Sequence, residues 1–199
     1  MTAWHAVFDL GQKADDVAFL SALIAHLKET LAVDPKRVYM AGHSSGAMMT
    51  YRYAAERGGD LAAIGAVAGS VGSDYGTDGT HSIRIPAPVA PVSVIAFHGK
   101  ADPTVPYDWR AKGGEAPAFH FVPAPEPKRT ETFAGNIVRE TWTGGKQGTE
   151  VVFYTIVNGN HKYPGGVYSA ADVASAYGPP NRQIFATPLI GEFFRLHRR

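Results

Sequence analysis

A serine flanked by small residues is the first feature of this sequence that could do covalent chemistry. Ser44 lies in the stretch Gly42-His43-Ser44-Ser45-Gly46, directly after the apolar run 38–41. That run predicts a short buried strand, and residues 45–57 predict a helix. A G-x-S-x-G stretch between a strand and a helix is typical of a sharp turn that exposes the serine as a nucleophile, with small flanking residues giving it room. The backbone N–H of Ser45, at the helix start, would face a developing oxyanion.

A serine hydroxyl needs a base to take its proton and an acid to orient that base. Asp102 follows the predicted strand 92–97, and His161 follows the predicted strand 151–157 in a glycine-rich loop. Side chains just beyond strand ends can reach a common site. We therefore predict Ser44 as nucleophile, His161 as base and Asp102 as the orienting acid.

Neighbouring residues have other predicted roles. His43 sits inside the turn, so we expect a structural or pocket-wall role for it and not that of the base. His98 ends its strand and is expected to bond to the backbone, while Asp108 is the alternative acid. Aromatic residues near the loops would line an acyl or aromatic pocket or would simply pack the loops: Tyr107, Trp109 and Tyr163.

The elements that position these residues alternate between strand and helix periods. A helix is predicted to open at Asp15-Asp16 and to end by Asp34-Pro35, since an Asp can cap the first N–H groups and a residue before proline avoids the helical region. Its expected core face is formed by Val17, Leu20, Ile24, Leu27 and Leu31. A further strand is predicted over 64–68, and further helices over 129–143 and 183–196. This order favours one α/β domain, residues 1–199, with a mostly parallel sheet flanked by helices.

Composition excludes several classes of function. The chain has 199 residues, 45% hydrophobic and 19% charged, with a net charge of +1 and no cysteine. We therefore expect no nucleic-acid partner, disulfide scaffold or membrane span, and no metal, because no His, Asp and Glu residues show ligand spacing. Residues 1–5 lack the pattern of a signal peptide.

Several motifs recur in order along most of the chain, from Asp15 to Gly166. They are Asp15-Asp16-Val17-x-Phe19, Val33-Asp34-Pro35-x-Arg37-Val38-Tyr39, Gly42-His43-Ser44-Ser45-Gly46, His98-Gly99-x-x-Asp102-x-x-Val105-Pro106-Tyr107 and His161-x-x-Pro164-Gly165-Gly166. This set resembles the polyhydroxybutyrate depolymerase and feruloyl/acetyl-xylan esterase family of α/β-hydrolases. The resemblance implies cofactor-free hydrolysis of esters, including polymer-linked or aromatic acyl esters, often by secreted proteins. It assigns the triad roles to Ser44, Asp102 and His161.

The sequence departs from that family at its amino-terminal side. Family members carry a longer first half with extra strands and a His-Gly strand end that supplies a second oxyanion donor; here only residues 1–13 precede the first predicted helix. We expect the strand before Ser44 to be a sheet edge, covered by the apolar run 4–10 or pairing with a second copy of the chain. We also expect weak activity on short, activated esters, since loss of one oxyanion donor costs about 10²- to 10³-fold in rate. The alternatives are a binding or assembly scaffold with little or no activity, or an enzyme that cleaves thioesters or peptides.

Overall fold

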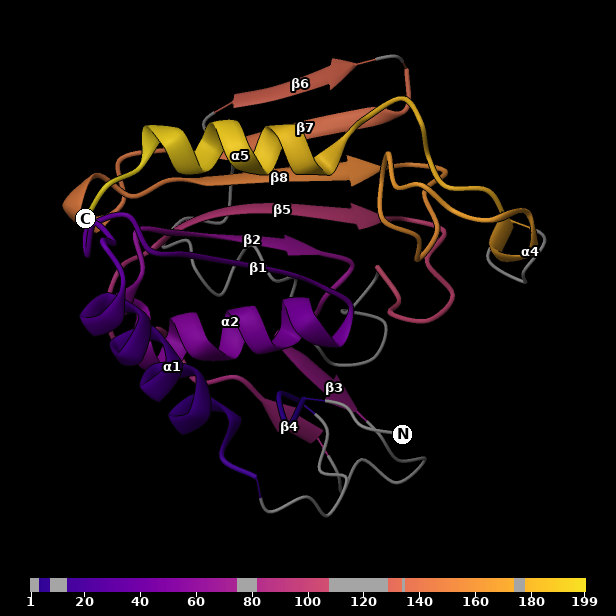
Figure 1. Ribbon diagram of the computed structural model, residues 1–199. Coiled ribbons are helices and arrows are strands. Elements are labelled where there is room, and N and C mark those ends of the chain that lie inside the picture. Colours follow the sequence, from indigo (N-terminus) through magenta and orange to yellow (C-terminus); the bar gives the residue numbers. More distant parts are fainter. Residues whose placement is uncertain (1–3, 8–13, 75–81, 108–128, 134, 174–177) are drawn as a thin grey trace.

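A six-stranded sheet with helices on both faces forms the centre of the molecule (Figure 1). The computed structural model describes residues 4–7, 14–74, 82–107, 129–133, 135–173 and 178–199. The sheet order is β1-β2-β5-β8-β7-β6, and the first four strands run parallel. The strand bounds are β1 Tyr39–His43, β2 Ala63–Val67, β5 Ser93–Gly99, β6 Arg129–Phe133, β7 Ile137–Trp142 and β8 Val151–Ile156. The predicted α/β class is confirmed.

Helices cover the two faces of this sheet unequally. On one face lie α1 (Asp16–Thr30) and α2 (Ser45–Arg57), and on the other lies α5 (Ala186–Leu196) (Figure 1). The short pieces are the turns Gly58–Asp60 and Lys146–Gly148, the hairpin of β3 (Gly72–Asp74) and β4 (Ser82–Arg84), and α4 (Ala170–Val173). The side chains of β2, β5 and β8 are buried throughout, as expected of strands packed on both faces.

The first and last helices differ in part from their predictions. In α1 Asp15 caps Ala18 N–H as expected, and Val17 is buried, but Leu27 and Leu31 are exposed. Leu20 and Ile24 pack against the core as expected, so the predicted core face is wrong only for Leu27 and Leu31, at the end of α1. Helix α1 lies at the margin of the molecule beside α2 (Figure 1). Helix α5 begins at Ala186, three residues later than predicted. Pro188 falls in its first turn, where a missing N–H costs no intrahelical bond.

The predicted helix 129–143 is wrong. This segment forms the antiparallel strands β6 and β7, and β7 pairs with β8 from Ile137 opposite Ile156 to Trp142 opposite Val151. Threonine, isoleucine and valine are frequent in the segment and suit strands. Gly135, with φ +74°, and Asn136 supply the turn between the two strands.

Strand β1, which leads to Ser44, lies at one edge of the sheet. It pairs with β2, and no other described strand is hydrogen-bonded to it, as expected from the sequence. The apolar run 4–10 is the predicted cover of this edge. Of this run, residues 4–7 are described and contact helices: His5 N–H donates to Asp16 in α1, and Arg52 in α2 donates to the His5 carbonyl. Residues 8–10 lie outside the described residues, so the cover of the edge stays a prediction.

Candidate active site

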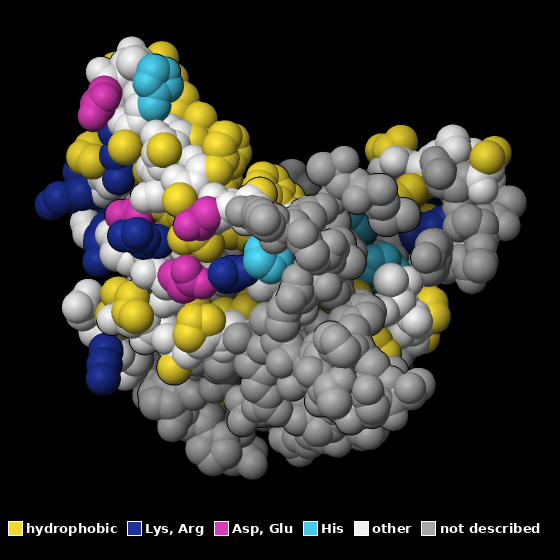
Figure 2. Space-filling view, turned by 90° about the horizontal axis from the view of Figure 1, so that it is seen from below, with side chains coloured by type: hydrophobic (Ala, Val, Ile, Leu, Met, Phe, Trp, Pro, Cys, Tyr) yellow, Lys and Arg dark blue, Asp and Glu magenta, His cyan; other side chains and the backbone are white. Residues whose placement is uncertain are grey.

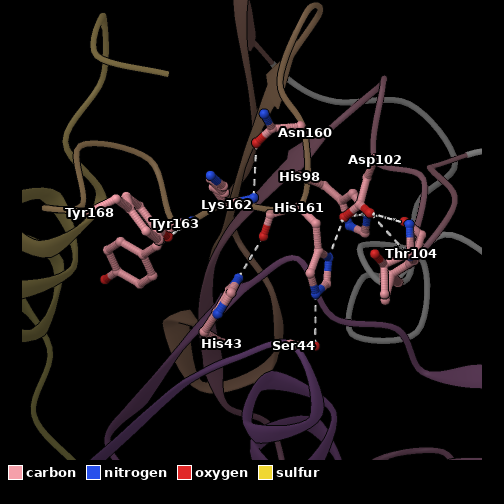
Figure 3. A network of polar contacts seen from close by, with 11 residues as sticks. His43, Ser44, His98, Asp102, Thr104, Asn160, His161, Lys162, Tyr163 and Tyr168 are labelled. Atoms are coloured by element: carbon pink, nitrogen blue, oxygen red, sulfur yellow. Dashed lines mark hydrogen bonds and ion pairs between the residues drawn. The ribbon is translucent and has the colours of Figure 1, made fainter. Parts of the chain in front are cut away.

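Three side chains from distant parts of the sequence meet beyond the carboxyl ends of the parallel strands. Ser44 follows β1, Asp102 follows β5 and His161 follows β8 (Figure 3). His161 Nδ1 lies 2.8 Å from Asp102 Oδ2, and His161 Nε2 lies 2.9 Å from Ser44 Oγ. The structure therefore brings together the three residues that the sequence singled out, within hydrogen-bonding distance and in one chain of contacts.

The turn at Ser44 is backbone-strained and tightly packed. Ser44 has φ 55° and ψ −121°, in the left-handed half of φ that residues other than glycine rarely adopt. Its N–H donates to the Val67 carbonyl at 2.9 Å, which ties the turn to the end of β2. A Cβ added at Gly42 would lie 2.3 Å from the carbonyl carbon and oxygen of Gly46. The predicted need for a small residue is thus confirmed at Gly42, whereas a Cβ at Gly46 would meet no described atom within 4 Å.

Alanine substitution at each of the two glycines tests whether the glycine is needed because a side chain would not fit there. Gly42→Ala is expected to lower the free energy of unfolding by about 1–3 kcal/mol or more, because the backbone atoms of Gly46 cannot move away from the added methyl group. In Gly46→Ala the new Cβ meets no described atom within 4 Å, so this variant is the matched control. Urea unfolding of both variants measures the difference, and equal stability of the two would contradict the geometry of the turn.

Asp102 is held as a carboxylate by donors on both of its oxygens. Oδ1 accepts the backbone N–H groups of Thr104 and Val105, each at 2.9 Å, and Oδ2 faces His161. Burial opposes ionisation of this side chain, but the hydrogen bonds from His161, Val105 and Thr104 outweigh it and lower the pKa of Asp102. Since a carboxylate only accepts, His161 carries its proton on Nδ1, and its Nε2 is left to accept the Ser44 hydroxyl proton.

A second histidine lies on the other side of Asp102. His98 is buried, and its Nε2 lies 2.8 Å from the Val105 carbonyl and 3.6 Å from Asp102 Oδ2. Burial lowers the pKa of His98, so the ring is neutral near pH 7 and the 3.6 Å approach is not an ion pair. The predicted bond from His98 to the backbone is confirmed. Its place beside Asp102 was missed, although the spacing of four residues in His98-Gly99-x-x-Asp102 could have indicated it.

The other predicted site residues differ in their placement: some lie beside Ser44 and His161, one packs in the core, and two are outside the described residues. Ser45 is the first residue of α2, which places its N–H at a helix amino terminus. The Tyr163 ring meets the His43 ring edge-on with centroids 5.8 Å apart, beside the site. Tyr107 bonds to Thr155 Oγ1 at 2.8 Å and packs against the core, so the structure favours the packing alternative for it. Trp109 and the alternative acid Asp108 lie outside the described residues.

In the space-filling view, histidine side chains are partly visible beside the atoms drawn in grey (Figure 2). Within the part of the chain that the structure describes, no group of three or more His, Cys, Asp and Glu side chains could hold a metal ion. In the same part of the chain, no helix has the length and apolar character needed to cross a membrane.

Known proteins with similar sequences carry esterase names. A putative esterase, NocK, from Nocardia uniformis subsp. tsuyamanensis is 31% identical over 179 residues, which cover 77% of this chain and 50% of that protein. A probable feruloyl esterase C from Aspergillus niger is 32% identical over 110 residues, 54% of this chain and 35% of its own length. The chain thus spans about half of the Nocardia protein. These names agree with the resemblance found in the motifs.

Solved structures and a family model agree on the fold. An acetyl xylan esterase from Aspergillus awamori matches with a TM-score of 0.50 and 18% identity, over 79% of this chain and 65% of that one. A thermostable esterase matches with a TM-score of 0.52 and 14% identity, over 94% of this chain and 38% of that one. At such identities the likeness shows the fold alone. The model of the alpha/beta hydrolase family matches residues 2–188. The chain therefore belongs to the alpha/beta hydrolase family.

Proposed function

We propose that this chain is a carboxylic ester hydrolase that works through an acyl-enzyme intermediate. The observation that carries the proposal is the contact chain Asp102 Oδ2–His161–Ser44 Oγ, at 2.8 and 2.9 Å. A nucleophile, a base and an orienting acid in this arrangement suit acyl transfer. The esterase names of the relatives support the same class of reaction.

The mechanism follows from the proton positions. His161 Nε2 takes the Ser44 hydroxyl proton while Ser44 Oγ attacks the ester carbonyl carbon. The Asp102 carboxylate stabilises the imidazolium that forms, and the Ser45 N–H donates to the oxyanion. Collapse of this intermediate expels the alcohol, which takes its proton from His161 Nε2. Water then attacks the acyl-Ser44 ester by the same route and releases the acid.

The proposed substrates are short, activated esters, with polymer-linked or aromatic acyl esters as the wider class. The feruloyl esterase names among the relatives that are similar in sequence favour this class over others. Tyr163, whose ring packs edge-on against His43, is the described aromatic residue that we propose contacts an acyl group.

Hydrolysis of p-nitrophenyl acetate and p-nitrophenyl butyrate by the purified chain tests the proposal. Turnover of both is expected, with slower cleavage of a matched amide because the leaving group is poorer. The rate on a matched thioester is compared with the rate on the ester, because a thioesterase would favour the thioester. No turnover of any of these substrates by a folded chain would overturn the proposal and would favour a scaffold without activity.

A further inference from the structure

The backbone of His161, as well as its side chain, is tied to the strand that carries Ser44. His43 is the last residue of β1, and its Nε2 lies 2.8 Å from the carbonyl oxygen of His161 (Figure 3). Because a carbonyl oxygen only accepts, His43 must carry a proton on Nε2 and donate it. Two consecutive residues of one strand end therefore hold His161 at two points, its carbonyl group and its ring.

The topology explains why such a tie is needed. Strands β2 and β5 lie between β1 and β8, so the ends of β1 and β8 are about 14 Å apart at the usual spacing of strands. The loop after β8, residues 157–163, must carry His161 across this gap. Near β5 it is anchored by the bond from Ala101 N–H to the Gly159 carbonyl, at 2.9 Å. The bond from His43 fixes the loop at the β1 side, where the base must meet Ser44.

The chemical character of His43 suits this place beside a base. Its ring centroid is 5.2 Å from that of His161, and the Tyr163 ring packs edge-on against it. Burial lowers the pKa of His43, although the bond to the His161 carbonyl opposes this effect, so the ring is neutral near pH 7. A neutral donor holds the carbonyl without adding a positive charge next to an imidazole that must itself become positive. A lysine or arginine there would oppose that charge.

We propose that His43 is a positioning residue, which holds the His161 backbone so that the imidazole reaches Ser44 and Asp102 together. This inference rests on the proposed ester hydrolysis. A misplacement of about 1 Å in a catalytic group can cost about 10²-fold in rate. His43→Leu is therefore expected to lower kcat about 10- to 100-fold, with little change in the KM for p-nitrophenyl acetate.

A matched variant distinguishes the hydrogen bond from simple filling of space. The substitution His43→Gln keeps an N–H donor of comparable reach and should hold kcat within about tenfold of the unchanged chain. Thermal unfolding followed by circular dichroism checks that both variants are folded. The inference is overturned if His43→Leu keeps its kcat and raises KM, which is the result expected of a pocket wall. Equal losses in the Leu and Gln variants would overturn it as well, because the donor would then be irrelevant.

A measurement independent of activity keeps this inference separate from the proposed function. In the ¹⁵N-histidine NMR spectrum of the unchanged chain, His43 is expected as the Nε2–H tautomer. The His161 Nδ1–H signal, from the proton shared with Asp102, is expected to broaden in His43→Leu and to persist in His43→Gln. An Nδ1–H tautomer of His43, or a His161 signal unchanged in His43→Leu, would overturn the inference. If the chain hydrolyses no ester, the proposed function fails, while these spectra still judge the contact.

Discussion

Ser44→Ala is expected to abolish ester hydrolysis and to leave the chain folded. The substitution removes the oxygen that lies 2.9 Å from His161 Nε2, so no acyl-enzyme can form. Loss of a nucleophile that works with its base as a unit lowers kcat by about 10⁴- to 10⁶-fold. Rates on p-nitrophenyl butyrate, measured beside a thermal melt of each variant, give the comparison.

The neighbouring serine provides a matched control. Ser45→Ala keeps the backbone N–H that is proposed to stabilise the oxyanion and removes only a hydroxyl group. This variant is expected to retain most of the activity of the unchanged chain. Retention of more than about 1% activity by Ser44→Ala would be incompatible with a nucleophilic role for Ser44.

Asp102→Asn is expected to lower kcat by about 10³- to 10⁴-fold with little effect on the fold. The reason lies in the two backbone donors on Oδ1, the N–H groups of Thr104 and Val105. An asparagine must turn its carbonyl oxygen toward these donors, which directs its NH₂ group at His161 Nδ1. That nitrogen must then be unprotonated, so the proton moves to Nε2, and the imidazole can no longer accept the Ser44 proton.

The same substitution at Asp108 separates the two candidate acids. Asp108→Asn is expected to leave the rate of ester hydrolysis within about threefold of the unchanged chain, because Asp102 supplies the contact with His161. Rates on p-nitrophenyl butyrate for the two variants, with thermal melts, give the test. A large loss in Asp108→Asn together with a small loss in Asp102→Asn would reverse the assignment.

Much of the site was predictable because it depends on short-range patterns placed at strand ends. The apolar runs that become β1, β5 and β8 are each followed by a polar residue of the required type, Ser44, Asp102 and His161. In a parallel sheet these ends lie at one edge, so chain order and residue type were enough to bring the three together.

Two parts of the fold were not predicted, for different physical reasons. The helix expected over 129–143 is a hairpin because its β-branched residues pair with the edge of β8, and the Gly135-Asn136 turn signal was overlooked. The last two apolar positions of the first helix, Leu27 and Leu31, were assigned to the core from their spacing alone. Spacing shows which residues share a face, whereas Leu27 and Leu31 are exposed because of where α1 lies relative to α2.

The contacts around the three predicted catalytic residues depend on the tertiary structure more than on local pattern. The bond from His43 to the His161 carbonyl joins residues 118 positions apart and depends on the path of a loop. The approach of His98 to Asp102 spans only four residues but depends on the turn of the chain after β5. Both contacts belong to the tertiary structure, and both lie beside the predicted catalytic residues.

The central claim, an activated serine at position 44, is tested most directly by covalent trapping with a fluorophosphonate. Mass spectrometry of the labelled chain is expected to find one phosphonyl group per molecule, on the peptide that contains Ser44. Labelling should be absent in Ser44→Ala and strongly slowed in His161→Ala, which lacks the base. A folded chain that takes up no label, or that carries it on a residue other than Ser44, would contradict the account.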